Sequence, residues 1–274
     1  RSPGMGSIRT DTDVTFLDPS RDERADLYRP AESATHCPIA VFLHGGAFHR
    51  GDKASERSQT LCRLLAESGV AVLSANYLLS PGTEGDKRWQ AWPTNLLDAA
   101  SAVRFVVQNG QKLGLDASRI AVVGASAGGT LALLLAFGAA DTLAGEPISD
   151  SICSVVNFYG RIDWSRHTDE KKKPSSEDIA RAASPLAWLE SRQGVSPPVL
   201  TFHGDNDQVV PVEHAWLLDE TLRGRGIPHE LVILPGVPHA FALESSPETI
   251  YDRLTGFLAT RLKQTTATSA RSES

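Results

Sequence analysis

The sequence has little cysteine, no long hydrophobic run and no excess of positive charge. Its three cysteines, Cys37, Cys62 and Cys153, are odd in number and widely spaced, which speaks against a disulfide framework and against a zinc site. No apolar run approaches the roughly eighteen residues that a membrane span needs, so we expect none. A formal net charge of -6 argues against nucleic acid and anionic membranes as partners.

The two ends of the chain are polar. Met5 is the only methionine, and the first residues lack the hydrophobic core of a signal peptide. We therefore interpret residues 1–12 as a disordered lead left by expression, and the Ser/Thr-rich residues 264–274 as a disordered tail. The expected location is the cytoplasm, unless the lead has replaced a native signal peptide.

Between these ends, apolar runs typical of strands alternate with segments of helical spacing. Six runs are short and continuous, as in strands buried on both faces: 39–43, 70–77, 120–124, 152–158, 198–202 and 230–234. Two further runs, 14–17 and 25–28, predict an antiparallel hairpin at a sheet edge. The alternation predicts a single α/β domain over residues 13–263, with about eight mostly parallel strands and helices on both faces. The polar segment 161–183, broken by Pro174, is interpreted as an insertion forming a small lid.

One serine lies between a predicted strand and a predicted helix, within Gly124-Ala125-Ser126-Ala127-Gly128. Such a strand-to-helix turn is too tight for bulky residues two places before and after the serine, and both of those places are glycine. The turn presents the hydroxyl above the sheet edge, next to the free N–H groups of the helix start. This pattern is typical of a nucleophilic serine.

The loops after the last two predicted strands supply the groups that such a serine needs. A serine hydroxyl needs an imidazole to accept its proton, and the imidazole needs a carboxylate to orient it. We predict His239 as the base and Asp207 as the acid, with Asp205 bonded to backbone N–H groups within its own turn instead. His203, Asp205 and His239 lack the short spacing of metal ligands, so no metal is predicted.

An attacked carbonyl also needs N–H donors for the negative charge that develops on its oxygen. We predict the Ala127 N–H as one donor, and the turn containing Gly45 and Gly46 as the source of the other. Aromatic residues on nearby loops are candidates for the substrate pocket, above all Phe48, Trp92 and Tyr159.

These motifs together, from His44-Gly45-Gly46 through Ser126 to His239, resemble those of the α/β-hydrolase superfamily and its esterase/lipase branch. Within that branch the chain is similar to hormone-sensitive-lipase-like carboxylesterases and to bacterial feruloyl and acetyl-xylan esterase-like proteins. It departs from the former in having Ala47 where a third glycine is usual, and in being too short for a large N-terminal cap. The motif Gly51-Asp52-Lys53 also resembles kynurenine formamidases.

The resemblance implies the α/β-hydrolase fold, the triad Ser126, Asp207 and His239, and no cofactor. Three functions are compatible with it. The first is a serine carboxylic ester hydrolase that cleaves small or aromatic esters, its small-molecule substrates, through an acyl-enzyme. The second is an amidase such as a kynurenine formamidase-like enzyme. The third, a non-catalytic ligand-binding protein, is disfavoured because His239 is present. The sequence does not indicate an oligomeric state.

Overall fold

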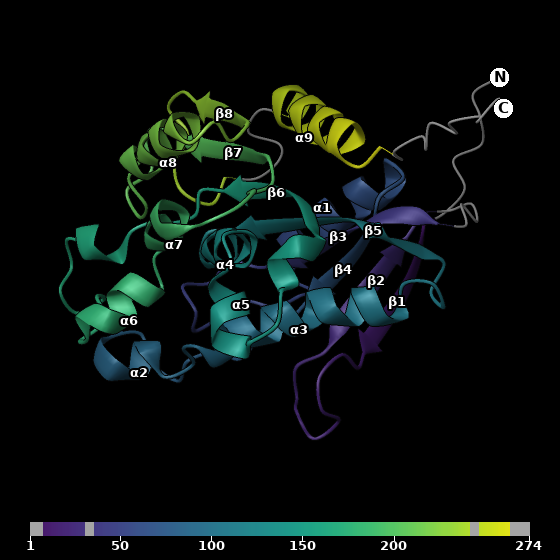
Figure 1. Cartoon of the computed structure of the whole chain (residues 1–274), viewed down its shortest axis with the longest axis horizontal. Helices are drawn as coiled ribbons and strands as arrows, with labels where there is room; N and C mark the ends of the chain where they lie inside the picture. Colours follow the sequence, from purple (N-terminus) through teal and green to yellow (C-terminus); the bar gives the residue numbers. More distant parts are fainter. Residues whose placement is uncertain (1–7, 31–35, 242–246, 264–274) are drawn as a thin grey trace, which may run out of the picture.

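The computed structural model describes residues 8–30, 36–241 and 247–263. Within them, eight strands form one sheet in the order β1-β2-β4-β3-β5-β6-β7-β8 (Figure 1). β2 pairs antiparallel with β1 and β4, and the other neighbours are parallel. The strands are β1 (Arg9–Val14), β2 (Ala25–Arg29), β3 (Cys37–Leu43), β4 (Ala71–Ala75), β5 (Leu115–Ala125), β6 (Ile152–Phe158), β7 (Val199–Gly204) and β8 (His229–Leu234).

Helices cover both faces of the sheet (Figure 1), as the alternation of strands and helices predicts. One face packs against α1 (Glu56–Glu67) and α9 (Pro247–Arg261). The other packs against α3 (Thr94–Asn109), α4 (Ala127–Ala136), α5 (Ala139–Ala144), α7 (Pro185–Ser191) and α8 (Glu213–Gly224). Shorter elements are α2 (Gly85–Trp89), α6 (Glu177–Ala182), η1 (Ile148–Ser151) and η2 (Trp164–Arg166).

The hydrophobic core is divided between these two faces by the alternation of side chains along each strand. In β5, Val122 packs with the α3 and α4 side, whereas its neighbour Val123 packs with the α1 and α9 side, and both are fully buried. A strand buried on both faces needs apolar residues at every position. This is why β3, β5 and β6 appear in the sequence as continuous apolar runs.

The predicted edge hairpin exists, but its first strand lies earlier than expected. β1 is Arg9–Val14 rather than residues 14–17, and its register pairs Arg9 with Arg29 and Asp11 with Leu27. The prediction that residues 1–12 form a lead outside the domain is therefore wrong for 9–12. β1 is polar and mostly exposed, so backbone pairing forms it and the apolar pattern does not reveal it. Residues 1–7 and the tail 264–274 lie outside the described residues.

The insertion 161–183 packs beside α2 instead of forming the predicted lid (Figure 1). The Gly85 N–H donates to the Lys171 carbonyl at 2.8 Å, and the Trp89 indole N–H donates to the Lys172 carbonyl at 3.1 Å. Trp164 of the insertion is buried and packs edge-on against Trp89, with ring centroids 4.7 Å apart. These contacts hold the segment at one end of the molecule.

Candidate active site

Ser126 occupies a strained turn between β5 and α4. Its φ and ψ are 53° and -117°, outside the regions that non-glycine residues ordinarily adopt. A Cβ atom on Gly124 would overlap the Gly128 carbonyl, and one on Gly128 would overlap the Leu43 carbonyl, so only glycine fits at either place. The Ser126 N–H donates to the Phe158 carbonyl at 2.8 Å, which ties the turn to β6.

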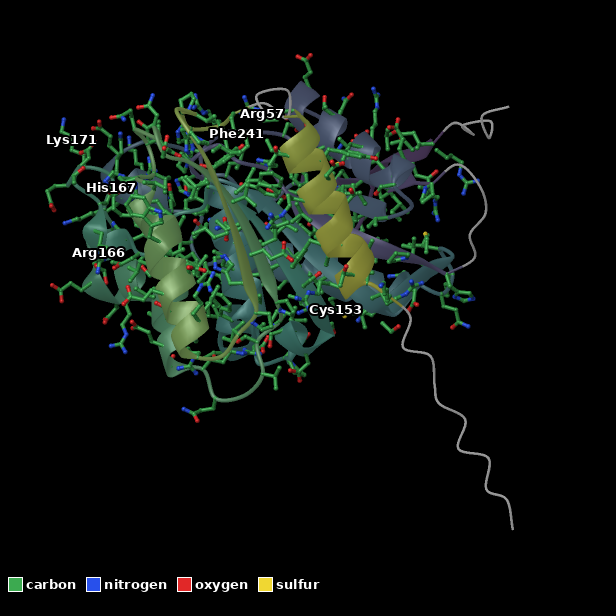
Figure 2. All side chains as sticks on the ribbon, turned by 90° about the horizontal axis from the view of Figure 1, so that it is seen from above. Arg57, Cys153, Arg166, His167, Lys171 and Phe241 are labelled. Carbon is green, nitrogen blue, oxygen red and sulfur yellow. The ribbon has the colours of Figure 1, made fainter. Side chains whose placement is uncertain are left out.

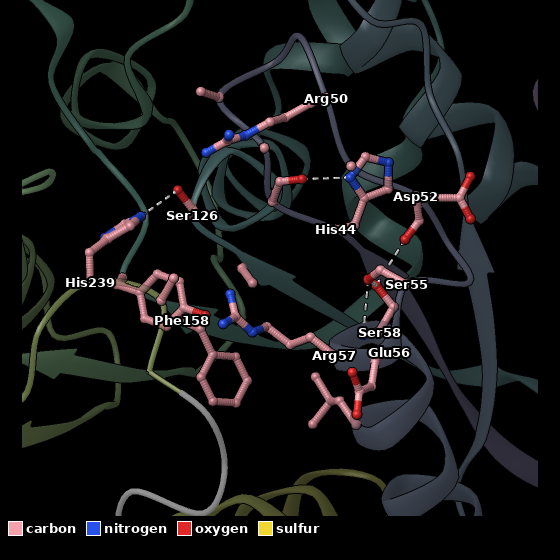
Figure 3. A pocket seen from close by; sticks show the side chains of 18 of the residues that line it. His44, Arg50, Asp52, Ser55, Glu56, Arg57, Ser58, Ser126, Phe158 and His239 are labelled. Carbon is pink, nitrogen blue, oxygen red and sulfur yellow. Dashed lines mark hydrogen bonds between the residues drawn. The ribbon is translucent and has the colours of Figure 1, made fainter.

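The three side chains predicted as a triad form one hydrogen-bonded chain. The Ser126 hydroxyl donates to His239 Nε2 at 3.0 Å, and His239 Nδ1 donates to Asp207 Oδ2 at 2.6 Å. This arrangement requires a neutral imidazole with its proton on Nδ1, the tautomer that can take a proton from the serine. Figure 3 shows His239 and Ser126 facing each other across the mouth of the β5–α4 turn.

The loop around Asp207 holds its carboxylate in the ionised form. Asp207 Oδ1 accepts the backbone N–H groups of Val209 and Val210 at 2.9 and 2.8 Å, and Oδ2 lies 3.3 Å from His203 Nε2. Burial alone would raise the Asp207 pKa, but the bonds from His203, His239 and Val210 outweigh it and hold that pKa well below its ordinary value. The carboxylate therefore stays charged and acts on His239 through its negative charge.

Asp205 has a different partner in the same loop. Its Oδ1 accepts the Gly236 N–H at 2.6 Å, which joins the loop after β7 to the loop that carries His239. Asp205 therefore bonds a backbone N–H as predicted, but the prediction that this N–H lies within its own turn is wrong, because the partner belongs to the loop after β8.

The turn after β3 places Gly45 against Ser126. A Cβ on Gly45 would lie 3.3 Å from Ser126 Cβ and 2.9 Å from the Ala125 carbonyl. His44 supports this turn from behind: its Nδ1 donates to the Gly45 carbonyl at 2.7 Å, and its ring stacks on Tyr77 at 4.5 Å. Burial lowers the His44 pKa, so this imidazole stays neutral.

The structure thus brings the predicted oxyanion turn, Gly45 and Gly46, to the same place as Ala127, which opens α4 directly after the serine. The N–H groups at the start of a helix have no acceptor within the helix. The assignment of these three residues as oxyanion donors stays a prediction.

A cavity of about 760 Å³ opens in front of Ser126 and His239. One wall is aromatic, made by Phe158, Tyr159 and Phe241, and Tyr159 packs edge-on against the His239 ring at 4.9 Å. The opposite wall comes from the turn after β3 and the start of α1 (Figure 3). Burial raises the pKa of Tyr159 to about 12, so its hydroxyl stays protonated at neutral pH.

Of the three predicted pocket residues, only Tyr159 lines this cavity. Phe48 is buried in the core, with its ring centroid 5.9 Å from those of Trp89 and Trp164. Trp92 is half-buried against the same core. The prediction of Phe48 and Trp92 as pocket residues is therefore wrong, because Phe48 packs in an aromatic cluster with Trp89 and Trp164, and Trp92 packs against the apolar core.

No residue of the insertion 161–183 is among the described residues that line the cavity. Figure 2 shows Arg166, His167 and Lys171 of this segment well apart from Arg57 and Phe241, which lie at the cavity. The segment therefore does not cover the site in this structure.

Sequence reasoning missed several residues around the site. Arg50, Arg57 and Phe241 line the cavity, and His203 Nε2 lies 3.3 Å from Asp207 Oδ2. Arg57 belongs to the polar first turn of α1 and carries no motif, so only the folded structure shows that it lines the same cavity as Ser126. The signal for His203 was its place directly before the predicted acid loop.

Within the described residues, no group of three or more His, Cys, Asp or Glu side chains is arranged to hold a metal ion. In the same part of the chain, none of the helices combines the length and the apolar character that crossing a membrane would require.

We compared the chain with known protein families and curated proteins. The model of the BD-FAE family matches residues 25–222. Esterase LipC of Mycobacterium tuberculosis is 31% identical over 245 residues, covering 82% of this chain and 58% of LipC. Ethyl acetate hydrolase of Pseudomonas putida is 31% identical over 237 residues, covering 78% of this chain and 70% of that protein.

Among solved structures, a truncated carbohydrate esterase from gut microbiota superimposes with a TM-score of 0.81 at 21% identity, over 96% of this chain and 99% of that one. At this identity the likeness shows the shared fold.

Proposed function

The chain belongs to the BD-FAE family of α/β-hydrolases, and from that premise we propose that it is a serine carboxylic ester hydrolase. One observation carries the proposal: the hydrogen-bonded chain from Ser126 through His239 to Asp207 lies at a cavity large enough for a small substrate. The names of LipC and of ethyl acetate hydrolase support ester cleavage.

The first half of the reaction uses all three side chains. Ser126 Oγ attacks the ester carbonyl while its proton passes to His239 Nε2, and the negative Asp207 stabilises the resulting imidazolium. The N–H groups of the turn at Gly45 and Gly46 and of Ala127 stabilise the oxyanion. Collapse of this intermediate breaks the ester C–O bond, and the alcohol leaves with the proton from His239.

The second half repeats these steps with water. A water molecule gives a proton to His239 and attacks the acyl-enzyme carbonyl, and the bond to Ser126 Oγ then breaks. The serine recovers its proton from His239, and the acid is released. Water and ester are thus converted to acid and alcohol, with the enzyme unchanged.

The shape and lining of the cavity favour small or aromatic esters. Phe158, Tyr159 and Phe241 provide flat apolar surfaces beside the nucleophile, on which an aromatic or short aliphatic group packs. No residue of the insertion 161–183 is among the described residues that contribute to this lining.

The test measures kcat/KM on 4-nitrophenyl esters of increasing acyl length, on a feruloyl ester and on N-formylkynurenine. We expect ester turnover in the wild-type protein, and a loss of about a thousandfold or more in Ser126→Ala. An organophosphate that phosphorylates serine should add one equivalent to the wild type and none to Ser126→Ala. Ester turnover that survives Ser126→Ala, or turnover of the formamide alone, would contradict the proposal.

A further inference from the structure

Two arginines line the same cavity as Ser126, and the steps of ester cleavage described above do not use them. Arg50 follows the turn at Gly46, and Arg57 lies in the first turn of α1; both line the cavity. In Figure 3 the Arg50 guanidinium extends toward Ser126 from one side, and the Arg57 guanidinium extends toward Phe158 from another. A ligand bound at Ser126 therefore lies between two positive charges.

The positions of both arginines are set by the fold around the site. The Arg50 N–H donates to the Gly46 carbonyl at 3.1 Å, and a Cβ on Gly46 would lie 3.1 Å from Arg50 Cγ, so this side chain crosses directly over the oxyanion turn. Arg57 lines the cavity together with the aromatic wall, and in Figure 3 its guanidinium lies near Phe158. Its charge lowers the pKa of Tyr159 against the larger effect of burial.

The acidic residues of the cavity leave this charge available. Asp52 also lines it, but its carboxylate accepts the Ala54 N–H at 2.7 Å and the Asn76 amide at 3.0 Å, and it points away from Ser126 in Figure 3. Glu56 lies beside α1, and in Figure 3 its carboxylate is separate from the Arg57 guanidinium, which lies near Phe158. No carboxylate whose position the structure describes lies within 4.0 Å of either guanidinium group.

We propose that the cavity selects esters that carry a carboxylate, with Arg57 and Arg50 binding that group while Ser126 attacks the ester carbonyl. A guanidinium is the side chain best suited to a carboxylate, because it donates two parallel hydrogen bonds and stays charged. The bound carboxylate takes no part in bond making or breaking. This inference rests on the proposed esterase activity and specifies its substrate class.

Matched ester pairs test the selection. Mono-4-nitrophenyl glutarate carries the carboxylate on the acyl side, and its neutral match is 4-nitrophenyl methyl glutarate. 4-Carboxyphenyl acetate carries it on the alcohol side, and its match is the corresponding methyl ester. In the wild type we expect kcat/KM for the charged member of at least one pair to exceed that of its neutral match by about tenfold, and added salt to reduce this preference. The pair that shows the preference identifies the side that faces the arginines.

Substitutions then assign the preference to the arginines. Arg57→Gln and Arg50→Gln should each lower the ratio of kcat/KM for the charged ester to kcat/KM for its neutral match by up to about tenfold, whatever their effect on the neutral ester itself. Arg57→Lys should retain part of the preference. Arg63→Gln is the matched control, because Arg63 is exposed on the same helix and does not line the cavity; it should leave both esters unchanged.

The outcomes separate this inference from the esterase proposal. If the neutral esters are cleaved but neither pair shows a charge preference, or if Arg57→Gln behaves like Arg63→Gln, the inference is wrong and the esterase proposal stands. If no ester is cleaved, the esterase proposal fails and calorimetry with glutarate decides the binding claim. Glutarate binding that Arg57→Gln abolishes would support the carboxylate site, and no binding would overturn it.

Discussion

Asp207 and Asp205 lie two residues apart in one loop, yet their carboxylates have different tasks. Asp207 accepts the Nδ1–H of His239, whereas Asp205 accepts the Gly236 N–H and lies outside the triad. The side chain that faces the imidazole fixes its tautomer, and the other only joins two loops.

Exchange of each aspartate for asparagine measures this difference. We expect Asp207→Asn to lower kcat on a 4-nitrophenyl ester by about a thousandfold or more, because an amide does not stabilise the imidazolium and favours the wrong tautomer. Asp205→Asn should stay within about tenfold of wild type, since its amide oxygen still accepts the Gly236 N–H. Losses of equal size would remove the distinction between the two residues.

At the scale of single elements, the β5–α4 turn has no space for side chains at its two glycines. Gly124, Gly128 and the Leu43 carbonyl of β3 approach so closely that a single methyl group has no space. Ser126 lies between these two glycines, and its hydroxyl is 3.0 Å from His239 Nε2. The nucleophile and the packing of three elements therefore depend on the same glycines.

Gly128→Ala tests this dependence, because the added Cβ would meet the Leu43 carbonyl. We expect a loss of at least about 2 kcal/mol in the free energy of unfolding, or failure to fold, since overpacking of a rigid backbone contact cannot relax. The control is Gly256→Ala in α9, an exposed helical glycine with no atom within 4 Å of its Cβ position. That exchange should stabilise the protein by about 0.5–1 kcal/mol. Chemical denaturation of both variants gives the two values, and equal stabilities would contradict the packing argument.

At the scale of the whole molecule, buried histidines link stability to pH. His214 on α8 accepts a hydrogen bond from Arg161 at 3.0 Å, and burial together with the Arg161 charge lowers its pKa from 6.5 to about 3. The folded protein therefore keeps His214 neutral while the unfolded chain protonates it below about pH 6.5. Since the unfolded state then binds more protons, stability falls as the pH drops from about 6.5 toward 3.

His214→Asn should reduce this slope. Between about pH 7 and pH 5, we expect the wild type to lose up to about 2 kcal/mol more unfolding free energy than the variant. His36→Asn is the control, because His36 is exposed and its positive φ of 71° suits asparagine. Urea unfolding at the two pH values measures how much unfolding free energy each protein loses. An equal loss in wild type and His214→Asn would show that His214 does not cause the loss of stability in acid.

The sequence alone determined which loops carry the three side chains of the proposed triad. Ser126, Asp207 and His239 each follow a recognisable buried strand, and the carboxyl ends of parallel strands meet at one edge of a sheet. Local patterns therefore suffice to predict which loops converge, and the glycines around Ser126 mark which residue is the nucleophile.

Only the tertiary structure decided the walls of the cavity and the edges of the domain. Phe48 packs into an aromatic cluster and Trp92 packs against the apolar core, whereas Arg50, Arg57 and Phe241 reach the site, and no local pattern separates these two groups. The polar strand β1 likewise forms by pairing with β2 rather than by burying an apolar face. The physical reason is the distance along the chain over which each feature is determined. Periodicity and turn chemistry depend on residues that are neighbours in the sequence. Whether a side chain points into a cavity depends on elements that meet only after folding.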